Sequence, residues 1–169
     1  MPSQKIVINN TSIELREDGG RSGIRPLYRF HLQYIQGLIF VVDSNNREGI
    51  DRVRDELHRM FNDENLHNKS VLILANKQDL PNAMNIDELR DKLNVDKLNG
   101  NVKWHLQPTS AIHNKGIREG FQWLENSMVE KIDPIQPIVE TINDAKAMKN
   151  HLASIFNMDN IKAFINKFV

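Results

Sequence analysis

The chain has 169 residues, of which 40% are hydrophobic and 26% charged, and its 22 Lys and Arg residues balance its 22 Asp and Glu residues. This zero formal net charge gives no general attraction to nucleic acid, and the absence of cysteine excludes disulfides and thiolate metal sites. No apolar run approaches the roughly 20 residues that span a bilayer, and no covalent membrane anchor is readable, so we expect an intracellular protein, cytoplasmic or within an organelle-associated assembly.

The N-terminal part predicts a β-hairpin followed by a loop and a helix. Residues 6–8 and 11–15 flank Asn9-Asn10, and Asn tolerates the positive φ of a tight turn. Residues 18–23 are rich in glycine and predict a flexible loop. In residues 24–36, Pro26 suits a first helical turn, and three apolar residues recur at helical spacing: Leu27, Phe30 and Tyr34.

Three apolar strands are predicted next, at residues 37–42, 70–75 and 102–107, with the third at a sheet edge. A helix follows each strand: one capped by Ser44 or Asn45, one with Ile86, Leu89 and Leu93 facing inward, and one over residues 117–128. This alternation predicts a parallel sheet, with ligands at the carboxyl ends of its strands.

Pro134 and Pro137 predict a linker that starts a second unit. Beyond it, apolar residues at helical spacing predict two amphipathic helices that need a surface to cover them. We therefore divide the chain into residues 1–132 and residues 133–169.

Asn76-Lys77-Gln78-Asp79 follows the second strand and resembles the Asn-Lys-x-Asp element of guanine-nucleotide-binding proteins, which implies recognition of guanine. The Asp79 carboxylate can accept hydrogen bonds from the ring N1–H and the exocyclic amino group, which adenine does not offer in that arrangement. The Lys77 stem can lie along the base, and Asn76 can tie neighbouring loops together. Alternatively, the four residues form no more than a polar turn. Ser110-Ala111 after the third strand favours the guanine interpretation, because a backbone N–H there would face guanine O6.

Longer stretches resemble the ADP-ribosylation factor (Arf) family of small GTPases. They include residues 37–45, 55–60, 75–84 and 116–120 with Trp123, together with Gly20 and residues 24–27. The resemblance covers about residues 6–128. It implies an α/β fold of the P-loop-NTPase type with a mainly parallel sheet, here lacking its first, central strand and P-loop and carrying a C-terminal helical extension. It also implies a guanine-base remnant at Asn76, Lys77, Asp79, Ser110 and Ala111.

The departures from the family concern phosphate binding and hydrolysis. The sequence contains no Gly-x-x-x-x-Gly-Lys-Ser/Thr loop and no first switch. Glu17 stands where the family has an Asp that supports the metal, and Arg21 stands where a Gln orients water. A guanidinium cannot accept the proton of water, so no catalytic residue is assigned, although Arg21 could alternatively act as an internal arginine finger. We expect no required cofactor, at most weak GTP or GDP binding, and no Mg²⁺ or other metal site.

The missing central strand would leave a gap of about 10 Å between the hairpin and the strand at residues 37–42. We expect either that the hairpin moves or that a protein partner covers the gap and the C-terminal helices. The leading interpretation is an Arf-like pseudo-GTPase that acts as an interaction or structural subunit of a larger complex, with little or no hydrolysis. The alternatives are a GTP-binding switch in membrane traffic whose phosphate-binding half comes from elsewhere, and a guanine-base sensor.

Overall fold

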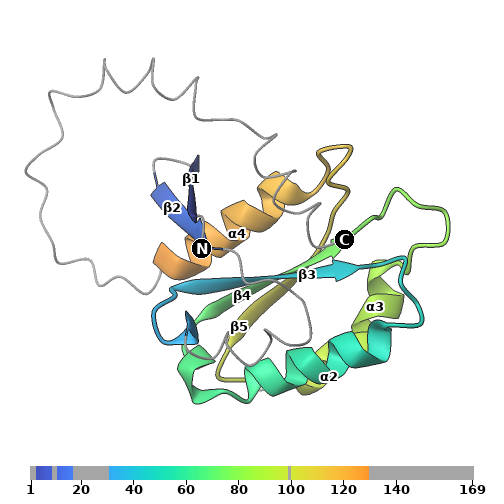
Figure 1. Ribbon diagram of the computed structural model, residues 1–169, viewed down its shortest axis with the longest axis horizontal. Coiled ribbons are helices and arrows are strands. Elements are labelled where there is room, and N and C mark those ends of the chain that lie inside the picture. Colours follow the sequence, from blue (N-terminus) through green and yellow to red (C-terminus); the bar gives the residue numbers. More distant parts are fainter. Residues whose placement is uncertain (1–2, 9–10, 17–30, 99, 130–169) are drawn as a thin grey trace, which may run out of the picture.

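The computed structural model describes residues 3–8, 11–16, 31–98 and 100–129 (Figure 1). Its strands are β1 (Ser3–Ile8), β2 (Thr11–Arg16), β3 (Gly37–Asp43), β4 (Ser70–Asn76) and β5 (Lys103–Pro108). Its helices are α2 (Ile50–Phe61), α3 (Ile86–Leu93) and α4 (Ile117–Val129), with short 3-10 turns η2 (Glu64–Leu66) and η3 (Val95–Lys97). Several predicted features lie outside the described residues: the Asn9-Asn10 turn, the segment from Glu17 to Phe30, and the linker and tail at 133–169.

Strands β3, β4 and β5 form a parallel sheet in that order, as the alternating pattern predicted. The register pairs Gly37 with Ser70 and Ser70 with Lys103. All seven residues of the central strand β4 are buried, whereas β5 at the edge mixes exposed and buried positions. Because the three strands run in the same direction, the loops after them meet at one edge of the sheet.

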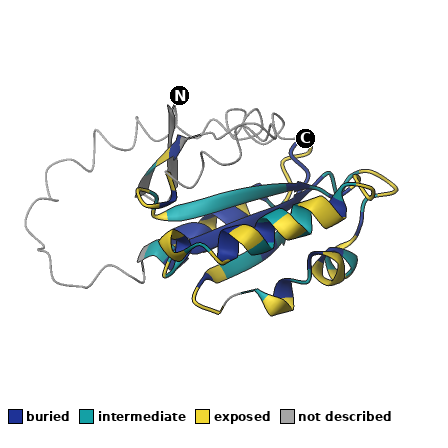
Figure 2. Cartoon of the chain, turned by 60° about the horizontal axis from the view of Figure 1, so that its bottom comes forward, coloured by how far each residue is buried: buried dark blue, intermediate teal, exposed yellow. Residues whose placement is uncertain are grey.

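Helices cover both faces of this sheet. Helices α2 and α3 lie on one face and α4 on the other (Figure 1). Successive side chains of β4 point to opposite faces of the sheet. Val71 and Ile73 pack into the hydrophobic core under α2 and α3, and Leu72 and Leu74 pack into the core under α4. Figure 2 shows buried residues gathered between helices and sheet, with exposed ones on the outer faces.

The hairpin of β1 and β2 forms a separate antiparallel sheet, with Ser3 opposite Arg16. Within the described residues no strand pairs with the outer edge of β3. The hairpin lies on the α4 side of the main sheet (Figure 1), where Leu15 is only 8% exposed and packs with Ile13 into the α4 core. The structure therefore agrees with the expectation that the hairpin moves, because Leu15 is buried against the α4 core and the hairpin forms a sheet of its own instead of extending the main one.

Two local predictions were wrong. Helix α2 begins at Ile50 after Gly49, so neither Ser44 nor Asn45 caps it. Ser44 is instead buried and accepts a hydrogen bond from Gln78 Nε2 at 2.9 Å. Tyr34 does not belong to a helical apolar face, since the described helical turn covers only residues 31–32 and Tyr34 is 80% exposed. The reason is that Leu32, not Tyr34, packs into the core.

Candidate guanine-base site

The tetrapeptide from Asn76 to Asp79 forms the turn at the end of β4. Lys77 has a φ of +68°, which is the left-handed region that a residue with a Cβ adopts at a cost of about 1 kcal/mol or more. The Leu80 N–H donates to the Lys77 carbonyl at 3.1 Å and closes the turn. The chain thus reverses sharply at the point where the sheet ends.

Asn76 connects three loops. Its side chain is 1% exposed, and its Oδ1 accepts hydrogen bonds from the Ala111 backbone N–H at 3.0 Å and from Thr109 Oγ1 at 3.4 Å. Its own carbonyl accepts from the Ser44 N–H at 3.0 Å. The loops after β3, β4 and β5 are therefore connected by the side chain and the backbone carbonyl of one buried residue.

Asp79 and Ser110 are in direct contact across two of these loops. The Ser110 hydroxyl lies 2.5 Å from Asp79 Oδ1, and Ser110 is 3% exposed while Asp79 is partly exposed. A hydroxyl donating to a carboxylate at this separation is a strong, charge-assisted hydrogen bond. This hydrogen bond orients the carboxylate that we predict to recognise guanine.

The Lys77 ammonium forms an ion pair with Asp43 at the end of β3, with Nζ 3.0 Å from Oδ2. The other oxygen of Asp43 accepts from the Asn45 N–H at 2.9 Å. Both side chains are about one-quarter to one-third exposed, so the pair contributes no more than about 1 kcal/mol. A base that packed on the Lys77 stem would therefore face only a small barrier from this pair.

Both backbone N–H groups of the Ser110-Ala111 pair have acceptors within the protein. The sequence predicted that this pair presents an N–H to guanine O6. In the structure the Ala111 N–H donates to Asn76 and the Ser110 N–H donates to the Lys115 carbonyl. A guanine O6 at this position would have to share one of these donors. The loop is otherwise well ordered by a bridge between Ser110 and Lys115, with N–H to O distances of 3.0 and 3.1 Å.

An ion pair supports the site from outside. Arg47, in the loop after β3, makes a bidentate contact with Glu88 of α3 and donates from Nε to the Asn82 carbonyl at 3.1 Å. The hydrogen bond from Arg47 is the main cause that lowers the pKa of Glu88 below its ordinary value. These contacts of Arg47 connect the loop after β3 to the segment that follows the turn from Asn76 to Asp79.

The structure brings Asn76, Asp79, Ser110 and Ala111 together and places Lys77 beside them, whereas Gly20, Arg21 and Glu17 lie outside the described residues. The sequence placed Thr109 with Ser110 and Ala111 at the carboxyl end of a strand, and Thr109 is part of the cluster. Sequence reasoning did not identify Asp43 or His113 as members. Asp43 could have been found as a polar residue at a strand end, but His113 carries no such signal. In the described part of the chain, no three His, Asp or Glu residues form a metal-binding group, and no helix is long and apolar enough to cross a membrane. A shallow groove lined by Lys103, Trp104 and Trp123 lies between β5 and α4, away from these loops.

The fold and the strand-end loops define an α/β protein of the small-GTPase class. The model superposes on the Arl6 (BBS3) small GTPase of Trypanosoma brucei, solved with the nucleotide analogue GppNp, with a TM-score of 0.73. The two chains are 23% identical, and the match covers 78% of this chain and 80% of the other. The family model of the ADP-ribosylation factor family matches residues 1–128, and the chain therefore belongs to the ADP-ribosylation factor family.

Proposed function

We propose that this chain is an Arf-family pseudo-GTPase that retains the loops for guanine recognition and acts through protein contacts, with little or no GTP hydrolysis. The observation that carries the guanine part is the linked cluster of Asn76, Asp79, Ser110 and Ala111, in which a buried amide and a buried hydroxyl orient the base-reading groups. Hydrogen bonds within the cluster fix these groups relative to one another. Such preorganisation lowers the entropic cost of binding a base.

The absence of hydrolysis is proposed from the residue types that the sequence offers. Arg21 occupies the position of the family's water-orienting Gln, and a guanidinium has no acceptor for the proton of water. Glu17 occupies the position of the Asp that supports the metal. We expect these two substitutions to suppress hydrolysis even where a nucleotide binds.

Binding by the 169 residues alone is expected to be weak. They contain no Gly-x-x-x-x-Gly-Lys-Ser/Thr loop, which in P-loop proteins surrounds the phosphates with backbone N–H groups and a Lys. Each charge-assisted hydrogen bond contributes about 1.5–3 kcal/mol, and about 1.4 kcal/mol is a tenfold change in affinity. The loss of three such bonds would weaken binding by about three to six orders of magnitude.

A protein partner is proposed because the outer edge of β3 has no paired strand in the described part of the chain. Such an edge offers unpaired N–H and C=O groups to another chain. A partner at this edge would make the protein a subunit of a larger complex. It would also hold the separate hairpin in a fixed position relative to the main sheet.

A GTP-binding switch is the second candidate, and the intact base-reading cluster favours it. In that case another polypeptide segment would supply the phosphate-binding half. Fluorescence titration with a labelled guanine nucleotide, with and without Mg²⁺, separates the two candidates. The pseudo-GTPase proposal expects weak binding that Mg²⁺ does not change. Tight, Mg²⁺-dependent binding by the isolated chain would contradict it, and a labelled adenine nucleotide serves as the control.

A further inference from the structure

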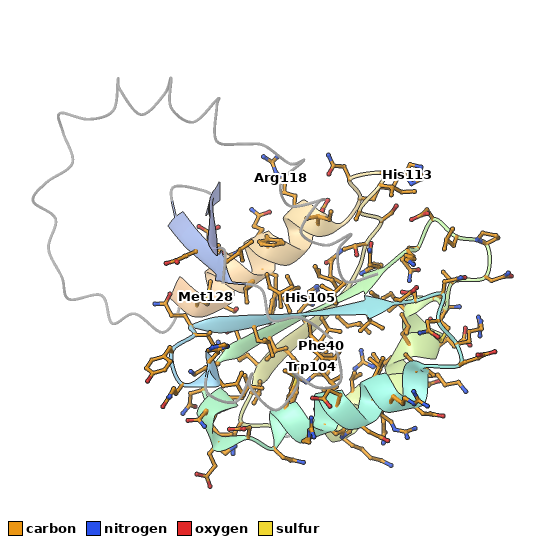
Figure 3. The ribbon with its side chains drawn as sticks, viewed as in Figure 1. Phe40, Trp104, His105, His113, Arg118 and Met128 are labelled. Carbon is orange, nitrogen blue, oxygen red and sulfur yellow. The ribbon has the colours of Figure 1, made fainter. Side chains whose placement is uncertain are left out.

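His113 lies on the turn that leads from Ser110 to α4, at the end of the molecule where that helix begins (Figure 3). Its Nδ1 is 3.0 Å from Ser110 Oγ, the same oxygen that contacts Asp79 Oδ1 at 2.5 Å. Two hydrogen bonds between Ser110 and Lys115 close the turn, and Asn114 at a φ of +59° helps the chain to reverse. The backbone thus holds the imidazole next to a buried hydroxyl.

The protons of this trio follow from the chemistry of the three groups. An ionised carboxylate only accepts hydrogen bonds, so the single hydroxyl hydrogen of Ser110 is donated to Asp79. The Ser110 oxygen can then only accept from His113, which requires a hydrogen on Nδ1. The direction of donation is therefore from His113 through Ser110 to Asp79, and each bond in such a chain strengthens the next.

We propose that His113 is a positioning residue for guanine selectivity. Its Nδ1–H fixes the hydroxyl of Ser110, which in turn donates to one lone pair of Asp79 Oδ1. The remaining acceptor sites of the two carboxylate oxygens stay available to the ring N1–H and the exocyclic amino group of guanine. This role rests on the proposed base-binding function. In this role His113, which lies between Ser110-Ala111 and Gly116, belongs to the site without itself contacting the base.

The first test needs no nucleotide. Ring ¹⁵N chemical shifts of His113 are measured by NMR at a pH at which the imidazole is neutral. We expect the hydrogen on Nδ1 in the native protein and a change in this tautomer preference in Ser110→Ala. A neutral ring that carries its hydrogen on Nε2 in the native protein would overturn the proposed direction of donation.

The second test measures base selectivity as the ratio of affinities for GDP and inosine diphosphate, which lacks the exocyclic amino group. His113→Leu should lower this ratio by about three- to tenfold, because one hydrogen bond that orients the carboxylate is lost. His113→Asn should keep the ratio, since its amide nitrogen can donate from nearly the same position. In a Ser110→Ala background, His113→Leu should have no further effect.

The control is His58→Leu, because His58 contacts the Leu93 carbonyl away from this trio. We expect this variant to leave the ratio unchanged. An unchanged ratio in His113→Leu, with GDP still bound, would overturn the role of His113 and leave the proposed function standing. Failure of the native protein to bind GDP at any concentration would overturn the guanine site itself, whereas the tautomer measurement still decides whether the His113–Ser110–Asp79 chain exists.

Discussion

Asn76 shows how a single polar residue organises the site. A buried amide is tolerated only when its groups are hydrogen-bonded, and Asn76 Oδ1 satisfies donors from Ala111 and Thr109. The sequence identified Asn76 because it stands at the end of a buried strand. The partners were not predictable from spacing alone, because they lie more than 30 positions further along the chain.

Replacement of Asn76 by Ala should lower the free energy of unfolding by about 1–3 kcal/mol, because the Ala111 N–H is left buried without an acceptor. Urea denaturation followed by circular dichroism measures this loss. Asn126→Ala on the exposed side of α4 serves as the control and should change stability by less than about 0.5 kcal/mol. Equal losses in the two variants would show that the amide of Asn76 does not link the loops.

At the scale of elements, the loop after β3 depends on contacts with other segments. Neither Ser44 nor Asn45 serves as a helix cap. Ser44 is buried and hydrogen-bonded to Gln78, and the side chain of Asn46 accepts the Gly49 N–H at 3.0 Å. The Arg47–Glu88 pair then fastens this loop to α3. Local sequence signals for a cap were outweighed by burial of the serine.

The Arg47–Glu88 pair predicts a pH dependence of stability. The pKa of Glu88 is lowered in the folded state, first by the hydrogen bond from Arg47, so the stabilisation is present above the ordinary carboxyl range and is lost as the pH falls through the folded-state pKa. Glu88→Gln should therefore lower the urea midpoint at about pH 7, and the difference from the native protein should shrink and vanish as the pH falls below the folded-state pKa of Glu88.

Glu48→Gln, in the same exposed loop, is the control for this measurement. We expect it to show a smaller difference at every pH. A Glu88→Gln difference that persisted unchanged into acid would mean that the carboxylate charge is not its source.

The turn before α4 depends on Gly116. Its φ of +75° suits glycine, and a Cβ added there would lie 2.0 Å from the Pro108 carbonyl oxygen. Gly116→Ala should therefore displace the segment that carries Ser110 and lower the free energy of unfolding by about 2 kcal/mol or more. Gly100→Ala is the matched control, because a Cβ there meets no atom within 4 Å. Comparable stability of the two variants in urea would contradict this explanation.

At the scale of the whole molecule, the hairpin and the main sheet are joined by side-chain packing. Leu15 and Ile13 enter the core formed by Leu72, Leu74 and Phe121. Hydrogen bonds between strands do not connect the two sheets in the described residues. We infer that the hairpin is the first part of the domain to detach when this packing is weakened.

Leu15→Ala should lower the free energy of unfolding by about 2–5 kcal/mol if the hairpin folds together with the rest of the domain. Hydrogen exchange of the β1 and β2 amides, compared with those of β4, measures whether the loss is global or local. Glu14→Gln, on the exposed side of the same strand, is the control. Unchanged exchange in Leu15→Ala would show that the hairpin does not depend on the α4 core.

The proposed assembly has a direct test in sedimentation of the native protein. We expect the chain to sediment with a partner or to self-associate when isolated, because an unpaired strand edge favours pairing with another chain. Behaviour as a monomer with one cooperative unfolding transition would contradict the proposal that it is stable mainly inside a complex.

The sequence by itself determined the parallel three-stranded sheet and the hairpin, and it predicted which loops form the candidate guanine site. These features depend on local signals: apolar runs of strand length, apolar residues at helical spacing and a short motif at the end of a strand. Asn76, Lys77, Asp79, Ser110 and Ala111 could be named because two such motifs follow two buried strands in the order that the fold requires.

Only the tertiary structure decided how these loops are held and where the hairpin lies. The contacts between Lys77 and Asp43, between Ser110 and Asp79, and between His113 and Ser110 depend on distances between segments that strand pairing and turn geometry set together. The position of the hairpin was decided by burial of Leu15 against α4, which no local pattern encodes. The contacts within the candidate site therefore depend on side-chain packing and backbone conformation over the whole domain. Residue type alone does not determine them.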